Sequence, residues 1–157
     1  MANFFKEPNK KQISKQPIKL TVQRISANGQ GVSKMGGKPV FIPGALLGEK
    51  VLVKILENKH KYSKAHLVEV IEPSEDRVTA KCKHFLHCGG CDLQHFPIAQ
   101  QLSLKQHKVE ELFNRQGIEV LPWQAPIIGT PFHYRRKARV GVQYNKKGAS
   151  IVGFRRA

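Results

Sequence analysis

Residues 18–59 read IKLTVQRISANGQGVSKMGGKPVFIPGALLGEKVLVKILENK, and the architecture of the chain follows from this stretch. Short apolar runs are separated by glycine-rich turn signals such as NGQG and KMGGK. In the first run, Leu20 and Val22 alternate with polar residues, which is the period of a strand with one buried face. A further apolar run, AHLVEVIE, follows at residues 65–72. Several short strands so closely spaced predict a small β-barrel over residues 18–72 rather than a helical domain.

The charge of the chain indicates its partner. Its 157 residues include 27 Lys plus Arg and 11 Asp plus Glu, which gives a formal net charge of +16. Such an excess attracts polyanions, and nucleic acid is the usual soluble one. No apolar run approaches the roughly 20 residues of a membrane span, and residues 1–17 lack the apolar core of a signal peptide. We therefore expect a cytoplasmic, monomeric protein without membrane association.

Part of this charge lies on the expected exposed face of the barrel. The residues concerned are Lys54, Lys59, His60, Lys61, Tyr62 and Lys64. Basic residues with an aromatic among them are typical of surfaces that bind RNA, because phosphate attraction and base stacking combine there. The alternative is a solvated, lysine-rich sheet edge that only prevents aggregation.

All three cysteines lie within ten residues, with the spacing C-x5-C-x2-C, and residues 89–90 between the last two are both glycine. Thiolates this close in sequence are suited to one soft-metal centre, and an odd number argues against a disulfide framework. We predict Cys82, Cys88 and Cys91 as metal ligands. Three interpretations remain open: buried structural thiols, a zinc site completed by a histidine, or an iron–sulfur cluster with a fourth cysteine outside this chain. The candidate histidines are His84, His87 and His95.

After this cysteine-rich loop, residues 73–97, the pattern predicts a helix from Ile98 to Gly117, with the glycine at its C-terminus. A β-hairpin is predicted over residues 134–157, with its turn at NKKG. That segment contains eight Lys or Arg and no acidic residue, a strong local signal for nucleic-acid binding. Its predicted RNA contacts are Arg135, Arg136, Lys137 and Arg139.

The predicted organisation is a basic disordered tail at 1–17, the barrel at 18–72, the cysteine-rich loop at 73–97, and a helix with a partial β domain at 98–157. The fold class is mainly β with some α. A hairpin without further strands is marginal in water, so we expect the sequence to stop within a domain. No nucleophile–base pair or phosphate-binding loop is present, and no catalytic residue is assigned.

Two motifs that follow the basic barrel carry a resemblance to a known family. They are CKHFLHCGGCDLQH at residues 82–95 and YRRKAR at residues 134–139. Over residues 18–157 the chain resembles the bacterial 23S rRNA uracil-5-methyltransferases. The resemblance implies that the barrel is an OB-like TRAM domain that binds 23S ribosomal RNA. It also implies that the three cysteines hold a 4Fe–4S cluster whose fourth cysteine lies later in the sequence.

In that family, a C-terminal Rossmann-like domain binds S-adenosylmethionine and carries a cysteine nucleophile and an acidic base. The thiolate adds to the uracil ring, which activates the neighbouring carbon for methylation. We therefore expect the N-terminal, RNA-binding portion of a methyltransferase, inactive by itself. The alternative is a stand-alone RNA-binding module stabilised by a zinc or iron–sulfur site.

Overall fold

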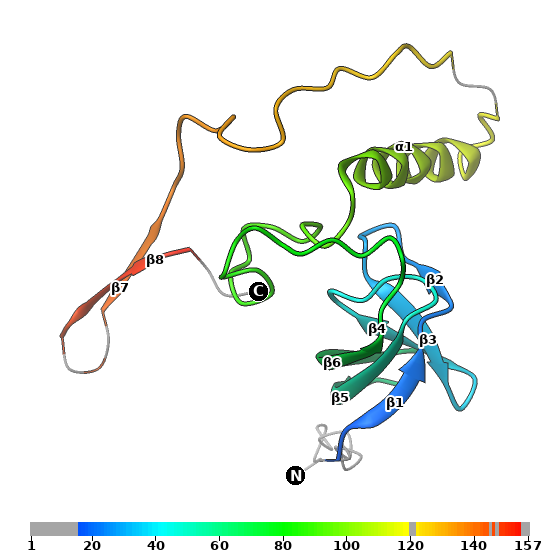
Figure 1. Cartoon of the computed structure of the whole chain (residues 1–157), viewed down its shortest axis with the longest axis horizontal. Helices are drawn as coiled ribbons and strands as arrows, with labels where there is room; N and C mark the ends of the chain where they lie inside the picture. Colours follow the sequence, from blue (N-terminus) through cyan, green and yellow to red (C-terminus); the bar gives the residue numbers. More distant parts are fainter. Residues whose placement is uncertain (1–15, 120–121, 145, 147, 155–157) are drawn as a thin grey trace, which may run out of the picture. The chain divides into compact units, whose positions relative to one another are not determined.

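The computed structural model describes residues 16–119, 122–144, 146 and 148–154. The basic tail predicted at residues 1–17 therefore lies almost wholly outside the described residues. The chain divides into two compact units, Met1–Ser74 and Glu75–Ala157. The predicted class, mainly β with some α, is confirmed, because eight strands and one helix are found among the described residues (Figure 1).

The first unit contains a six-stranded sheet with the spatial order β1-β5-β6-β4-β3-β2. Its strands are β1 (Ile18–Thr21), β2 (Arg24–Ile25), β3 (Gly31–Met35), β4 (Lys38–Ile42), β5 (Lys50–Asn58) and β6 (Ser63–Glu72). The β4–β6 pair is parallel and the other pairs are antiparallel.

The outer strands of this order, β1 and β2, are one continuous stretch of chain joined by two residues. The Val22 N–H donates to the Glu49 carbonyl over 2.9 Å, and the Gln23 N–H donates to the Val32 carbonyl over 2.9 Å. Residues 18–25, which belong to the blue ribbon in Figure 1, therefore bond first to the β5 side and then to β3. The sheet closes on itself, and the predicted small barrel is confirmed.

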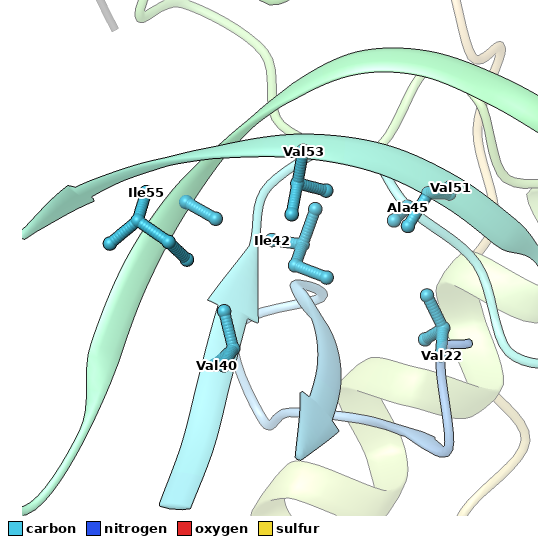
Figure 2. Packing of buried hydrophobic residues seen from close by; sticks show 8 residues of the cluster. Val22, Val40, Ile42, Ala45, Val51, Val53 and Ile55 are labelled. Atoms are coloured by element: carbon cyan, nitrogen blue, oxygen red, sulfur yellow. The ribbon is translucent and has the colours of Figure 1, made fainter. Parts of the chain in front are cut away.

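The core fills the inside of this barrel (Figure 2). Strand β5 alternates, with Val51, Val53 and Ile55 inside and Lys54 outside, as expected for Lys54. The buried cluster comprises Val22, Val40, Ile42, Ala45, Val51, Val53, Ile55 and Ala65. Each fully buried valine or isoleucine contributes about 1.5–3 kcal/mol from apolar burial.

A carboxylate is also buried in this unit, which the sequence did not indicate. Glu49 is fully buried, and its Oε2 accepts a hydrogen bond from the Leu46 N–H over 2.8 Å. Its Oε1 accepts one from the Ser74 N–H over 3.2 Å. Glu49 thus fastens the loop before β5 to the segment that leaves β6.

The second unit contains the cysteine-rich loop, helix α1 (Ile98–Asn114) and a hairpin of β7 (Gly141–Tyr144) and β8 (Ser150–Gly153). The helix ends at Asn114, three residues before the predicted end, and the predicted glycine closes the turn that follows it. Gly117 has φ +78°, its N–H donates to the Asn114 carbonyl, and the Ile118 N–H donates to the Phe113 carbonyl. These two bonds form a Schellman motif, which glycine favours because it adopts positive φ without strain.

We predict that Glu49→Ala destabilises the barrel by about 2–4 kcal/mol, because one buried and one partly buried N–H group lose their acceptors. Glu49→Gln keeps the shape of the side chain and one acceptor oxygen, so we expect a smaller loss of stability. Urea unfolding of both variants measures the difference. Equal stability of Glu49→Ala and the unmodified chain would contradict the role given to Glu49.

Candidate nucleic-acid interface and cysteine loop

The predicted basic surface centres on residues 57–64, here called the hairpin tip, where β5 turns into β6. The turn is closed by the Lys59 N–H, which donates to the Tyr62 carbonyl over 2.9 Å. Lys38 on β4 holds it from the side, because its Nζ donates to Asn58 Oδ1 and, over 2.9 Å, to the Lys59 carbonyl. The Ser63 hydroxyl also donates to Asn58 Oδ1, over 3.1 Å. The tip is therefore fixed to the barrel by side-chain hydrogen bonds.

Two lysines of the tip are engaged by one carboxylate. Glu57 Oε2 lies 3.4 Å from Lys59 Nζ and 3.6 Å from Lys64 Nζ. The hydrogen bond with the Tyr62 side chain, and then the Glu57 carboxylate, raise the pKa of Lys59 above its usual value. Lys59 therefore carries its charge throughout the physiological pH range. The sequence shows these lysines as a simple basic run, whereas the structure shows them paired.

The aromatic residue of the tip is less exposed than predicted. Tyr62 is half-buried, with its ring edge-to-face with Phe41 at a centroid distance of 5.9 Å. Lys59 Nζ lies 5.5 Å from the centre of the Tyr62 ring. Tyr62 is therefore only partly available for stacking, because Phe41 from the neighbouring strand β4 packs against its ring. Phe41 itself was not a sequence candidate.

The other predicted basic residues lie on the surface. Lys54 is exposed and faces His66 across the β5–β6 pair, and His60 and Lys61 are exposed in the turn. Strand β5 pairs with β1 only over residues 50–53, and β6 pairs with β4 only at residues 63–64. Residues 54–58 of β5 therefore have no strand partner on the β1 side among the described residues, and the alternative role of protecting an exposed edge applies to that part of the strand.

In the cysteine-rich loop, successive turns fold the spacer between Cys82 and Cys88. The Phe85 N–H donates to the Cys82 carbonyl over 3.0 Å, and the Cys88 N–H donates to the His84 carbonyl over 2.9 Å. Leu86 lies between them with φ +68°, in the left-handed region that costs a residue with a Cβ roughly 1–2 kcal/mol. The turns and this residue shorten the path between the first two cysteines.

The three cysteines are free thiols. Cys82 and Cys91 are exposed and Cys88 is half-buried, so the interpretation as buried structural thiols was wrong. The Cys82 N–H donates to the side-chain oxygen of Gln94 over 3.1 Å, so this glutamine binds the loop backbone at the first cysteine. Within the described ranges, no three His, Cys, Asp or Glu side chains converge closely enough to hold a metal ion. The predicted ligands are thus close in sequence but not gathered at one point.

The three candidate histidines differ in environment. His84 and His87 are exposed. His95 is buried, with its ring centroid 5.3 Å from that of Phe85 and 4.7 Å from that of Phe96. Aromatic packing explains the burial of His95 without a metal, and the predicted zinc tetrahedron is not assembled in the described part of the loop.

The second basic segment is extended chain rather than strand. The prediction placed residues 134–140 in the hairpin, but β7 begins at Gly141. The predicted contacts Arg135, Arg136, Lys137 and Arg139 are all exposed, and the Arg135 guanidinium lies 5.9 Å from the Tyr134 ring centre. The strand is short because no neighbouring strand among the described residues pairs with residues 134–140. Residues 145 and 147 of the predicted turn lie outside the described residues.

A groove of about 790 Å³ lies within the second unit, between residues 78–105 and 131–135. Lys81, Cys91 and Arg135 are among the side chains that line it. Lys81 Nζ lies 4.5 Å from the ring centre of Phe132, which is another lining residue. One predicted RNA contact and one predicted metal ligand therefore border the same groove.

Comparison with known proteins places the barrel in a family. Residues 15–68 match the TRAM domain, a range that takes in β1 to β5 and more than half of β6. The barrel is a TRAM domain. A solved structure, the solution structure of a conserved protein of Methanococcus maripaludis, is 28% identical, covers 44% of this chain and all of its own, and has a TM-score of 0.35.

Two curated relatives match almost the whole chain, including the residues that follow the TRAM domain. The 23S rRNA (uracil(1939)-C(5))-methyltransferase RlmD of Colwellia psychrerythraea is 46% identical over 99% of this chain. The protein of the same name from Aliivibrio fischeri is 38% identical over 99%. The chain spans 35% and 36% of their lengths. The resemblance to the N-terminal part of the 23S rRNA uracil-5-methyltransferases is therefore confirmed. Among the described residues, no helix has the length and apolar character needed to cross a membrane.

Proposed function

We propose that this chain is the RNA-recognition part of a cytoplasmic, S-adenosylmethionine-dependent methyltransferase that acts on a uracil C5 of 23S rRNA. The observation that carries the proposal is 46% identity, over 99% of the chain, to a relative named for that reaction. The TRAM domain and the net charge of +16 support an RNA ligand. Methyl transfer is proposed for the full-length protein, of which this chain resembles the first third.

In this proposal the two basic surfaces, the hairpin tip and residues 135–139, bind RNA in different ways. The hairpin tip offers lysines on a rigid turn, where hydrogen bonds from Lys38 limit the entropy lost on binding. The 135–139 segment offers three arginines and a lysine on exposed chain. Arginine can form paired hydrogen bonds with a phosphate or stack on a base. The tip thus acts as a fixed anchor and the segment as an adaptable one.

We also propose that Cys82, Cys88 and Cys91 provide three ligands of a 4Fe–4S cluster, with the fourth ligand outside this chain. The donor set fits, because three free thiols, two of them exposed, lie within ten residues. A cluster would cross-link the loop, and gathering the thiols would be coupled to its binding. The zinc alternative remains an outcome of the test below.

RNA binding by the 157-residue chain is expected to weaken steeply as salt rises, because each phosphate contact releases counterions. Replacing Arg135, Arg136 and Arg139 together with glutamine should lower the magnitude of the log–log salt slope by about 2, at roughly 0.7 per lost contact with single-stranded RNA. Filter binding to a 23S rRNA fragment that contains the target uridine measures both effects. Deleting residues 1–15 serves as the control and should cost less affinity. A salt-independent affinity, or an unchanged triple variant, would contradict the proposal.

Anaerobic reconstitution with iron and sulfide should give a brown protein with broad sulfur-to-iron charge-transfer absorption. The chain has only three cysteines, so the colour should bleach quickly in air. Cys88→Ser should abolish the absorption, whereas His84→Ala and His87→Ala should leave it nearly unchanged. One tightly held zinc per chain, lost with a single histidine, would instead establish the Cys3His site.

A further inference from the structure

Within the hairpin tip, two ammonium groups converge on a single oxygen. Lys59 comes from the turn and Lys64 from the start of β6, yet their Nζ atoms lie 3.4 Å and 3.6 Å from the same Glu57 Oε2. Glu57 and Lys64 face each other across the β5–β6 pair, so strand register creates this convergence. The tip therefore defines one anion position with two lysines around it.

The carboxylate occupies that position without being held firmly. Glu57 Oε2 is screened from solvent, and its distances of 3.4 Å and 3.6 Å to the two ammonium groups are longer than those of a regular hydrogen bond. Both lysine side chains remain more than half exposed, at 56% and 51%. Ion pairs this exposed are weak, because water and salt compete with them. A stronger anion that reaches the tip can take the place of the carboxylate.

A phosphate of an RNA backbone has the chemistry to do so. Its oxygens are anionic acceptors like a carboxylate oxygen, and it presents several of them to both lysines at once. The exchange needs only side-chain movement, since Lys38 holds the Asn58 side chain and the Lys59 carbonyl by hydrogen bonds that do not involve Glu57. The backbone of the tip can stay in place while the Glu57 side chain turns away.

We propose that Lys59 and Lys64 form a subsite for one RNA backbone phosphate, and that Glu57 occupies this subsite until RNA displaces it. The inference rests on the proposed RNA-binding function and deepens it. Glu57 would keep the two lysines aligned in the free protein. It would also weaken the binding of polyanions that cannot place a phosphate at this point, which makes it a residue for selectivity rather than affinity.

The test is to replace Glu57 with glutamine in the 157-residue chain and titrate a fluorescent single-stranded RNA by anisotropy at low salt. Removing the competing carboxylate should tighten binding about fivefold, which is the upper range for an exposed ion pair. Glu72→Gln is the matched control. Glu72 pairs with Lys50 over 2.9 Å at the other end of the same two strands, so the change in net charge is equal. Its effect should stay below about twofold, as expected for a remote screened charge.

A double-mutant cycle locates the effect at the subsite. In a Lys59→Gln, Lys64→Gln background, the gain from Glu57→Gln should fall to that of Glu72→Gln, because the anion position no longer exists. Equal gains from Glu57→Gln and Glu72→Gln in the unmodified chain would show a bulk charge effect and overturn the subsite. Unchanged or weaker binding by a folded Glu57→Gln chain would make Glu57 a structural brace. If no form binds RNA, the proposed function itself is overturned.

Discussion

The first unit depends on two backbone hydrogen bonds, those from the Val22 and Gln23 N–H groups to opposite sides of the sheet. They turn an open six-stranded order into a closed barrel, which buries the valines and isoleucines of its inner face. The basic hairpin between β5 and β6 is held separately, by the pairing of β4 with Ser63 and Lys64 and by the hydrogen bonds from Lys38. The candidate RNA surface is therefore fixed to the barrel through β4.

Local patterns were enough to predict most of the fold. The alternation in β1, the glycine after α1 and the turn signals of the barrel each reflect forces within a few residues, and the structure agrees with them. The extent of the C-terminal hairpin was not predictable in this way. Arg135 to Arg139 have a strand-like pattern, but a strand needs a partner, and none is present for them in the described residues. The buried Glu49 was missed because its acceptors serve backbone groups at Leu46 and Ser74, far apart in sequence.

The candidate site was predictable in composition but not in arrangement. The lysines of the tip could be predicted from the sequence because the residue type alone determines the charge. The engagement of Lys59 and Lys64 by Glu57 depends on register, and the cover of Tyr62 by Phe41 depends on the parallel β4–β6 contact. For the cysteines, the spacing indicates a shared metal centre. It does not determine whether the three thiols already lie close together in the metal-free loop. The described structure leaves them apart, so metal binding and loop ordering would form one event.

The closure of the barrel also has a consequence for synthesis of the chain on the ribosome. Strand β1 is made first, but its partner is β5, and Ile18 pairs with Val53. Residues 18–21 must therefore leave the exit tunnel and wait, without their hydrogen-bonding partner, until more than thirty further residues have followed. The β3–β4 hairpin needs no such delay, because Met35 pairs with Lys38. Long-range pairing of this kind slows folding, so β1 is among the last strands of the barrel to pair although it is synthesised before the others.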